Sequence, residues 1–156
     1  MIKNRDERLM YLLTGEDYNL IGQGVTSART SPNAQTSSSQ FIHQRNAAGG
    51  LSGYAPATAF TSQLDDEDPV SLFVQNIADN YLIGSDAATK LVELDTWKTT
   101  GSNARLREGI ISIDDPGSGD AGNPLDLNWT FTDQKDPVEG VFAKNETTHK
   151  WEFTPA

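Results

Sequence analysis

Few side chains in this 156-residue sequence could support catalysis or bind a metal ion. There is no cysteine, which excludes disulfides, cysteine nucleophiles and thiolate zinc sites. The two histidines, His43 and His149, are too few for a histidine-rich metal site. Neither the Gly-x-Ser-x-Gly motif nor the phosphate-binding Gly-Lys-Ser/Thr motif occurs. The sequence therefore offers no starting point for nucleophilic catalysis, and we expect neither a cofactor nor an enzymatic activity.

Two glycines, Gly22 and Gly24, begin like a dinucleotide-binding fingerprint. The third glycine of that fingerprint is missing, and a stretch rich in Ser, Thr and Asn follows where a helix would be needed. Glycines in a strand more often mark a bulge or a close backbone contact, and we interpret these two in that way.

Two groups of acidic residues could bind a hard cation through carboxylate oxygens. One comprises Asp114, Asp115 and Asp120 in a glycine-rich stretch, and the other spans residues 65–68. Neither spacing matches the EF-hand pattern. We interpret the first group as turn chemistry and the second as negative charge at the start of a helix, and we assign no metal ligand.

Three tryptophans, Trp97, Trp129 and Trp151, fall in strand-like segments, where they could stack on sugar rings. Core packing is the favoured interpretation, because Trp129 alternates with polar residues and Trp151 alternates with Phe153. A carbohydrate-binding or hydrolytic β domain, using these rings with nearby carboxylates, is the alternative of a different class.

The chain is strongly acidic, with 22 Asp and Glu against 12 Lys and Arg and a formal net charge of −10. Nucleic-acid binding relies on Lys and Arg, which displace counterions from phosphates. No Lys or Arg occurs between Asn46 and Thr89. The composition therefore argues against a protein that grips DNA or RNA. The charged N-terminus and the short apolar runs predict neither a membrane segment nor a secretion signal.

Apolar runs bounded by turn residues predict a mainly β, antiparallel fold. In the clearest strand, residues 125–132, the side chains of Leu125, Leu127, Trp129 and Phe131 alternate with polar ones, so one face is buried and the other is wet. A tight turn separates the first two segments. The predicted strands are 8–14, 17–26, 51–64, 89–98, 104–114, 125–132, 138–143 and 148–154.

A single flanking α-helix is predicted over residues 68–81. Asp68 is a favourable N-cap residue, and Pro69 suits the first helical position, where its missing N–H costs nothing. Gly84 supplies the stop. Apolar residues at helical spacing form one stripe that we expect to face the core: Val70, Phe73, Val74, Ile77 and Tyr81.

Residues 27–48 are dominated by Ser, Thr, Asn, Gln and Ala and contain little that can be buried. Such a segment cannot offset its ordering entropy by itself. We therefore predict a long polar loop that is ordered by contact with something else. Pro56 then predicts an edge or bulged strand over residues 51–64, because proline cannot donate to a sheet ladder.

Three passages carry a resemblance to a known family: RLMYLLTGEDYNLIGQGVTSARTSPNAQT, LSGYAPATAFTSQLDDEDPVSLFVQNIADN and REGIISIDDPGSGDAGNPLDLNWTFTDQKDPVEGVF. In strand order and turn residues they resemble the major tail tube proteins of long-tailed bacteriophages, which are related to the inner-tube proteins of contractile tails. The resemblance spans most of the chain. It implies one tail tube domain over residues 1–156, a β-sandwich or barrel-like subunit with the helix packed outside.

The family resemblance also implies how such subunits assemble. Subunits form hexameric rings whose inner strands close a barrel, and the rings stack into a tube. The loop 27–48 then corresponds to the long loop that reaches the neighbouring ring, through contacts that its Ser and Thr content makes polar. The residues expected in this ring-stacking loop are Ser31, Pro32, Asn33, Gln35, Thr36, Ser38 and Gln40.

A structural role in a virion tail follows from the resemblance. The partners it implies are sister subunits, a tail initiator or distal tail protein, a tail terminator and a tape-measure protein, with assembly in the host cytoplasm. DNA would pass through the lumen without specific binding, which suits an acidic chain because a basic wall would hold the phosphates. An inner tube of a contractile tail or phage-derived particle is the second assembly hypothesis.

Overall fold

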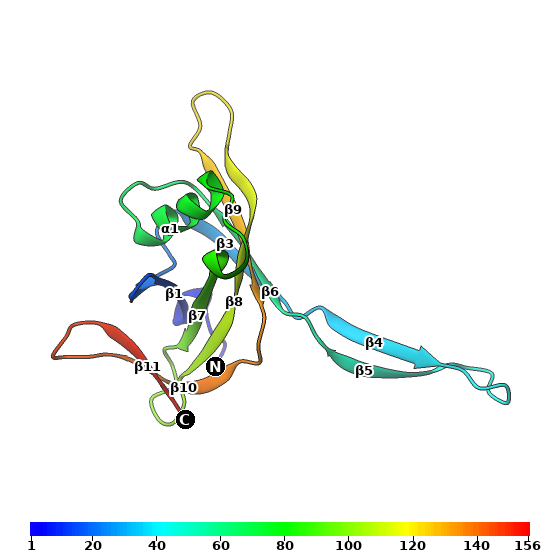
Figure 1. The fold of residues 1–156 in the computed structure, drawn as a ribbon. Helices are drawn as coiled ribbons and strands as arrows, with labels where there is room; N and C mark the ends of the chain where they lie inside the picture. Colours follow the sequence, from blue (N-terminus) through cyan, green and yellow to red (C-terminus); the bar gives the residue numbers. More distant parts are fainter.

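The computed structural model describes residues 1–156 and shows a mainly β protein with one α-helix, as predicted (Figure 1). Two short 3-10 helices, η1 (Arg5–Glu7) and η2 (Gly84–Ala87), precede β1 and β7. The other elements are β1 (Arg8–Thr14), β2 (Asp17–Leu20), β3 (Val25–Ser31), β4 (Ala34–Ser39), β5 (Ala48–Tyr54), β6 (Ala57–Ser62), α1 (Pro69–Asp79), β7 (Ala88–Asp95), β8 (Ala104–Ser118), β9 (Asp126–Asp133), β10 (Val138–Lys144) and β11 (Trp151–Pro155).

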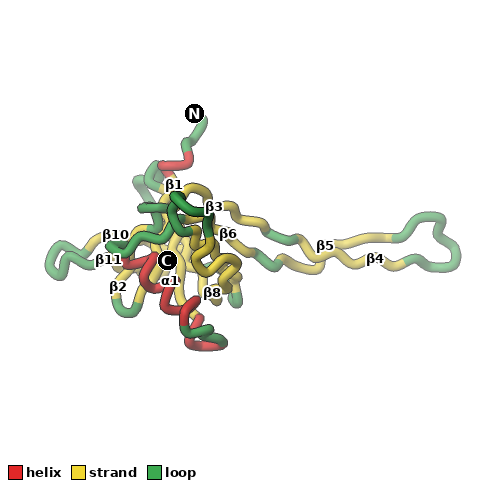
Figure 2. The backbone as a smooth tube through the Cα atoms, turned by 90° about the horizontal axis from the view of Figure 1, so that it is seen from above, coloured by secondary structure: helices red, strands yellow, loops and turns green.

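Nine strands form one antiparallel sheet that curls into a half-barrel. Its strand order is β2-β1-β7-β8-β9-β6-β3, and β10 pairs with β8 and carries β11 beside it. The strands β4 and β5 form a separate two-stranded sheet that projects away from this body (Figures 1 and 2). The molecule therefore consists of a body and one long hairpin.

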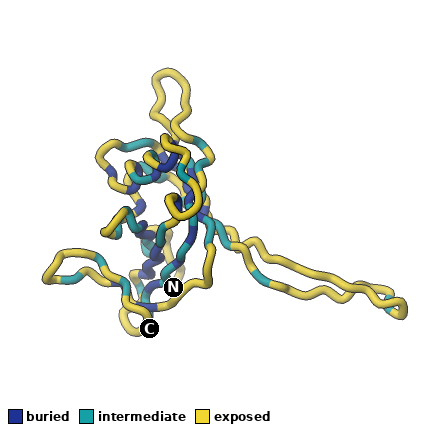
Figure 3. Tube along the Cα trace, viewed as in Figure 1, coloured by how far each residue is buried: buried dark blue, intermediate teal, exposed yellow.

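The main core lies between α1 and one face of the curled sheet, as the strict alternation in β9 predicts. Leu127, Trp129 and Phe131 are fully buried, and the Trp129 ring stacks on Phe60 with centroids 4.2 Å apart. Leu125 precedes β9 and is half-exposed, so the alternation holds only within the strand. Figure 3 shows that the buried residues are confined to the body.

A second, smaller core lies where the β10–β11 hairpin covers the opposite face of β1. Successive residues of a strand point to opposite faces, so Tyr11 lies on the other side of β1 from Met10 and Leu12. The Tyr11 ring lies 4.9 Å from Phe142 and 5.0 Å from Trp151, between ring centroids. Both faces of β1 are therefore covered within one chain.

The helix ends earlier than predicted. Asp68 is at the N-cap position and Pro69 is the first helical residue, but the helix stops at Asp79 and Asn80 is its C-cap. Tyr81 follows with a φ of 50° and is 86% exposed, so it does not extend the buried stripe. The chain reverses here because the N–H of Leu82 donates to the carbonyl of Ile77, 3.2 Å away.

The prediction of a continuous loop over residues 27–48 is wrong. Within this range the structure has most of β3, all of β4 and the first residue of β5, and only residues 32–33 and 40–47 lie outside strands. The predicted strand 51–64 is likewise two strands, β5 and β6, divided at Ala55 and Pro56, and β2 ends at Leu20 rather than at residue 26. The backbone N–H and C=O groups of this polar segment form hydrogen bonds with the paired strands β5 and β6. This pairing requires no buried side chains, so a polar segment can still form strands.

No helix in the structure has the length and apolar character needed to cross a membrane. The one α-helix instead places Val70, Val74 and Ile77 in the main core, with Phe73 partly buried against it.

The orientation of α1 predicts unequal effects of two similar truncations. Val74 is fully buried, whereas Leu72, two residues away, is 45% exposed. We expect Val74→Ala to lower the free energy of unfolding by about 2 kcal/mol, because it leaves a cavity in the core. The matched control, Leu72→Ala, is expected to change it by less than about 0.5 kcal/mol. Urea unfolding followed by circular dichroism measures both, and equal effects would contradict this helix orientation.

Candidate assembly interface

The projecting hairpin, which we call the arm (residues 32–55), has no buried residue. The strands β4 and β5 pair from Ala34↔Tyr54 to Ser39↔Ala48, with a bulge between Gln35 and Thr36. An isolated two-stranded hairpin is only marginally stable in water, because it has no third strand or helix to pack on. No other part of the chain therefore covers the surface of the arm.

The base of the arm is held by hydrogen bonds between the outgoing and the returning chain. The N–H of Ala55 donates to the carbonyls of Pro32 and Asn33, at 3.0 and 3.3 Å. In return, the side-chain amide of Asn33 donates to the carbonyl of Ala55, at 2.9 Å. Asn33 has a φ of 48°, a left-handed conformation that Asn tolerates better than most residues. The two ends of the arm are therefore adjacent in space.

The structure places all the predicted ring-stacking residues on this arm or at its base, and all are exposed. Ser31 ends β3, and Pro32 and Asn33 form the bend. Three more lie on β4, and the last begins the loop at the tip: Gln35, Thr36, Ser38 and Gln40. Their role in contacts between rings remains a prediction.

The tip of the arm is apolar, which the expectation of purely polar contacts missed. Phe41 is 60% exposed and Ile42 fully exposed, although the sequence shows both as isolated apolar residues in a polar stretch. The Gln40 side chain donates to the carbonyls of Gln44 and Arg45, at 3.0 and 3.1 Å, and so holds the turn. The turn presents two apolar side chains in a fixed arrangement.

Charge is divided sharply between the arm and the rest of the chain. Residues 27–64 contain Arg29 and Arg45 but no Asp or Glu, so all 22 acidic residues lie elsewhere. This second absence is visible in the sequence itself, and it overlaps the stretch between Asn46 and Thr89 that lacks Lys and Arg. The arm itself carries one cation, Arg45, and no acid, and this charge on an acidic body favours contact between the arm of one copy and the body of another.

Several strand edges of the body are open. Each of the outer strands β2 and β3 pairs with one neighbour only, β2 with β1 and β3 with β6. Along β8, the pairing with β7 stops at Ile110, whereas the pairing with β9 continues to Ser118. Unpaired N–H and C=O groups on such edges are templates for pairing with another chain.

An ion network lies beside the base of the arm and joins three strands. The buried Arg107 of β8 bonds Glu93 of β7 at 2.6 Å and Asp133 of β9 at 2.7 Å, and Arg105 also bonds Glu93, at 2.7 Å. Burial lowers the pKa of Arg107, but the bonds to Asp133 and Glu93 outweigh that effect and raise the pKa above its usual value. Because each of these charged groups is paired, the network holds strands in place.

The network is connected directly to the arm. The N–H of Asp133 donates to the carbonyl of Pro56, at 3.1 Å, immediately after the arm ends. Pro56 and Thr30 also line a cavity of about 380 Å³ together with Arg105 and Arg107. The residue that follows the arm is therefore tied to the strand that carries Asp133, and it borders the same cavity as the ion network.

A neighbouring ion pair predicts that acid weakens the fold. Burial raises the pKa of Asp95, but the bonds from Arg8 (2.6 Å) and Lys98 (3.1 Å) outweigh it and hold the pKa below its usual 3.8. A lowered carboxyl pKa adds stability above the unfolded-state pKa, and this stability is lost as the pH falls through the folded-state value. We expect the stability difference between wild type and Asp95→Asn to be constant above about pH 5 and to shrink below about pH 4. Urea unfolding at several pH values measures it, and a difference that does not change with pH would contradict the role of this pair.

Acidic side chains of both groups accept hydrogen bonds from residues of the same chain. Asp65 accepts hydrogen bonds from the N–H of Glu67, at 2.9 Å, and from the Gln23 side chain, at 2.6 Å. Asp114 accepts one from the Thr130 hydroxyl, at 2.6 Å. No three His, Asp or Glu side chains lie together as a group that could hold a metal ion. The contacts of Asp65 support the interpretation of the second group as helix-end chemistry. The turn interpretation is wrong for Asp114 and Asp115, because both lie within β8, and Asp114 bonds across to β9.

The tryptophans do not form one sugar-stacking surface. Trp129 is 1% exposed in the main core, and Trp151 packs on Phe142 and Tyr11 in the second. Trp97 is half-buried, with the cationic groups of Lys3 and Arg8 over its ring. The structure therefore favours packing for the first two rings.

Known proteins resemble this chain in fold and not in sequence. The chain matches no protein-family model, and no curated protein matches it by sequence. Among solved structures, it is similar to a chain in the tail of an empty gene transfer agent particle with C6 symmetry, with a TM-score of 0.64 and 15% identity. It is also similar to a chain in the virion of a native gene transfer agent particle, with a TM-score of 0.63 and 14% identity. Each comparison covers 90% of this chain and 100% of the other, so the shared fold includes nearly all of both.

Proposed function

We propose that this chain is the major tail tube subunit of a phage-like particle, a structural virion protein with no catalytic role. The observation that carries the proposal is the uncovered arm, on a chain whose fold is similar to chains in the tail and the virion of gene transfer agent particles. Nothing in a single chain packs on this arm, so a second copy can cover it. Residues 1–156 then form one tail tube domain, arm included.

Ring formation gives the open strand edges a partner. In a closed ring each subunit pairs its edges with the next subunit, so no edge is left as a template for aggregation. One of the chains to which this chain is similar belongs to a tail with C6 symmetry, which supports six subunits in a ring. The rings stack head to tail, a heterologous contact that continues until another protein stops it.

The arm supplies the contact between rings in this proposal, through Ser31, Pro32, Asn33, Gln35, Thr36, Ser38 and Gln40. The tube grows in the host cytoplasm from a tail initiator or distal tail protein, around a tape-measure protein, up to a tail terminator. DNA passes through the lumen without specific binding, because a net charge of −10 repels phosphates. We propose the tube of a long non-contractile tail, and binding of a sheath protein to the assembled tube would indicate the contractile type.

Negative-stain electron microscopy of the purified, concentrated protein tests the proposal. We expect rings with sixfold symmetry and tubes of uniform diameter that lengthen with time. Co-expression with the initiator encoded alongside is expected to shorten the lag. A chain that stays monomeric at high concentration, and also with its initiator, would contradict the proposed function.

A further inference from the structure

The body carries an open apolar groove that the fold itself does not fill. Its volume is about 400 Å³, and it lies between the end of α1, η2 and the part of β8 beyond Ile110. Tyr81 and Ile83 stand at its side, 86% and 82% exposed. The other principal lining residues are Ile77, Ile111, Ile113 and Pro116.

The position of Tyr81 is conformationally costly. Its φ of 50° is left-handed, a conformation that is rarely adopted by residues with large side chains. The same turn leaves Ile83 in solvent, where neither side chain gains from burial. A backbone outlier that exposes apolar side chains beside a groove points to contact with a partner.

Charge around the groove identifies the kind of partner that fits. Three exposed carboxylates are next to lining residues in the chain: Asp79, Asp86 and Asp114. No lining residue, and no residue next to one in the sequence, is Lys or Arg. The groove therefore suits an apolar group that carries positive charge beside it.

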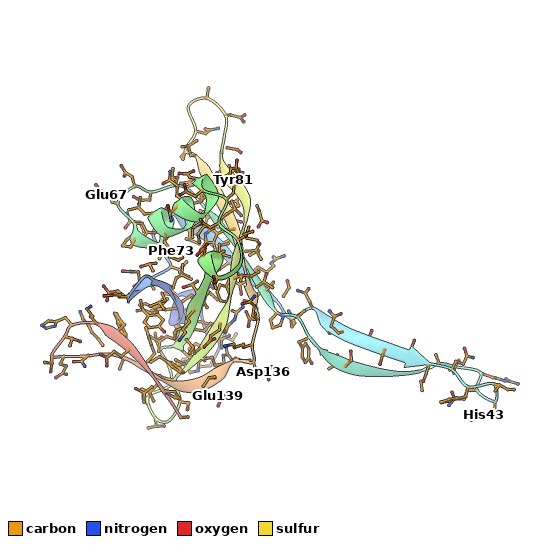
Figure 4. All side chains as sticks on the ribbon, viewed as in Figure 1. His43, Glu67, Phe73, Tyr81, Asp136 and Glu139 are labelled. Carbon is orange, nitrogen blue, oxygen red and sulfur yellow. The ribbon has the colours of Figure 1, made fainter.

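The tip of the arm has this chemistry. Phe41 and Ile42 are exposed and consecutive, Arg45 follows in the same turn, and residues 27–64 contain no acid that the rim would repel. Figure 4 shows His43 at the far end of the arm and Tyr81 on the body, so a chain cannot place its tip in its own groove. The twelve residues from Ser31 to Ile42 span roughly 35 Å when extended, so the tip lies far outside its own body.

We propose that the arm tip of one copy inserts Phe41 and Ile42 into the groove of a neighbouring copy, with Arg45 facing the acidic rim. This inference rests on the proposed function and names the surface that receives the arm. Burial of the apolar tip then stabilises the contact between copies, and the charges orient it.

Disulfide trapping tests the contact, because the chain has no cysteine of its own. The variant Ile42→Cys/Ile83→Cys changes one fully exposed residue of the tip and one exposed residue of the groove. On mild oxidation of its polymer, we expect a ladder of covalent oligomers on a non-reducing gel. The control is Ile42→Cys/Val141→Cys, in which Val141 is an exposed residue of β10 outside the groove, and it should give no ladder. Polymer without a ladder, or equal ladders in both variants, would overturn the inference.

Removal of the apolar tip gives a second measurement. Phe41→Ser/Ile42→Ser is expected to raise the protein concentration needed for polymerisation about 100-fold, or about tenfold for each side chain that is no longer buried. The matched control, Leu51→Ser/Tyr54→Ser, changes two exposed apolar residues of β5 on the same arm and should raise it less than about threefold. Equal shifts would also overturn the inference. A wild-type chain that forms no polymer would instead contradict the proposed function itself.

Discussion

A chain without its arm is expected to fold and yet to form no tubes. The variant lacks residues 34–54 and joins Asn33 to Ala55 through one inserted glycine. The junction is geometrically favourable, because the Ala55 N–H already lies 3.3 Å from the carbonyl of Asn33. An Asn-Gly pair also suits a tight hairpin turn. The deleted segment has no buried residue, so the body loses no core contact.

Four measurements check this expectation. The melting temperature and the circular dichroism spectrum should match those of the wild-type body, and negative-stain images should show no tubes. A small fraction of the variant mixed with wild type should also shorten the wild-type tubes, because it can receive an arm but cannot extend one. A variant that still builds long tubes on its own would refute a role for the arm in stacking.

Replacement of Arg107 by Met is expected to cost about 3–5 kcal/mol of folding free energy. The reason is that Asp133 stays buried without any cation, and Glu93 stays buried with Arg105 as its one remaining ion-pair partner. The total stability of a domain is typically about 5–15 kcal/mol, so the variant should be close to unfolding at room temperature. Urea unfolding measures the loss.

Two further variants test whether the loss of stability comes from unpaired buried charge. Lys135 pairs with Glu108 at 2.9 Å but is 72% exposed, so Lys135→Met should cost less than about 1 kcal/mol. The triple variant Glu93→Met/Arg107→Met/Asp133→Leu removes all three charges and should recover much of the loss, because no unpaired charge stays buried. If Arg107→Met melts like wild type, the ion network does not hold these strands together.

Much of the body could be predicted because its signals are local. The alternation of Leu127, Trp129 and Phe131 identifies a half-buried strand within a few residues, and Pro69 marks the start of the helix. The end of α1 was misjudged because apolar spacing continues to Tyr81, although the chain has already reversed at Asn80. Apolar spacing alone cannot distinguish a helical residue from one just beyond the helix.

The arm and the groove could not be predicted, for two different reasons. Polar strands such as β4 carry no hydrophobic pattern, and their pairing with β5 depends on backbone hydrogen bonds alone. The groove combines α1, η2 and β8, and no local pattern brings these three together.

By itself, the sequence determined the strand-rich class, the single helix, the acidity, the polar character of residues 27–48 and the absence of cysteine chemistry, since these follow from composition and short-range periodicity. Only the tertiary structure decided that the polar stretch is a projecting hairpin, that Arg107 is held between Glu93 and Asp133, and that Tyr81 and Ile83 border an open groove. The physical reason is that long-range pairing and burial depend on where distant segments meet.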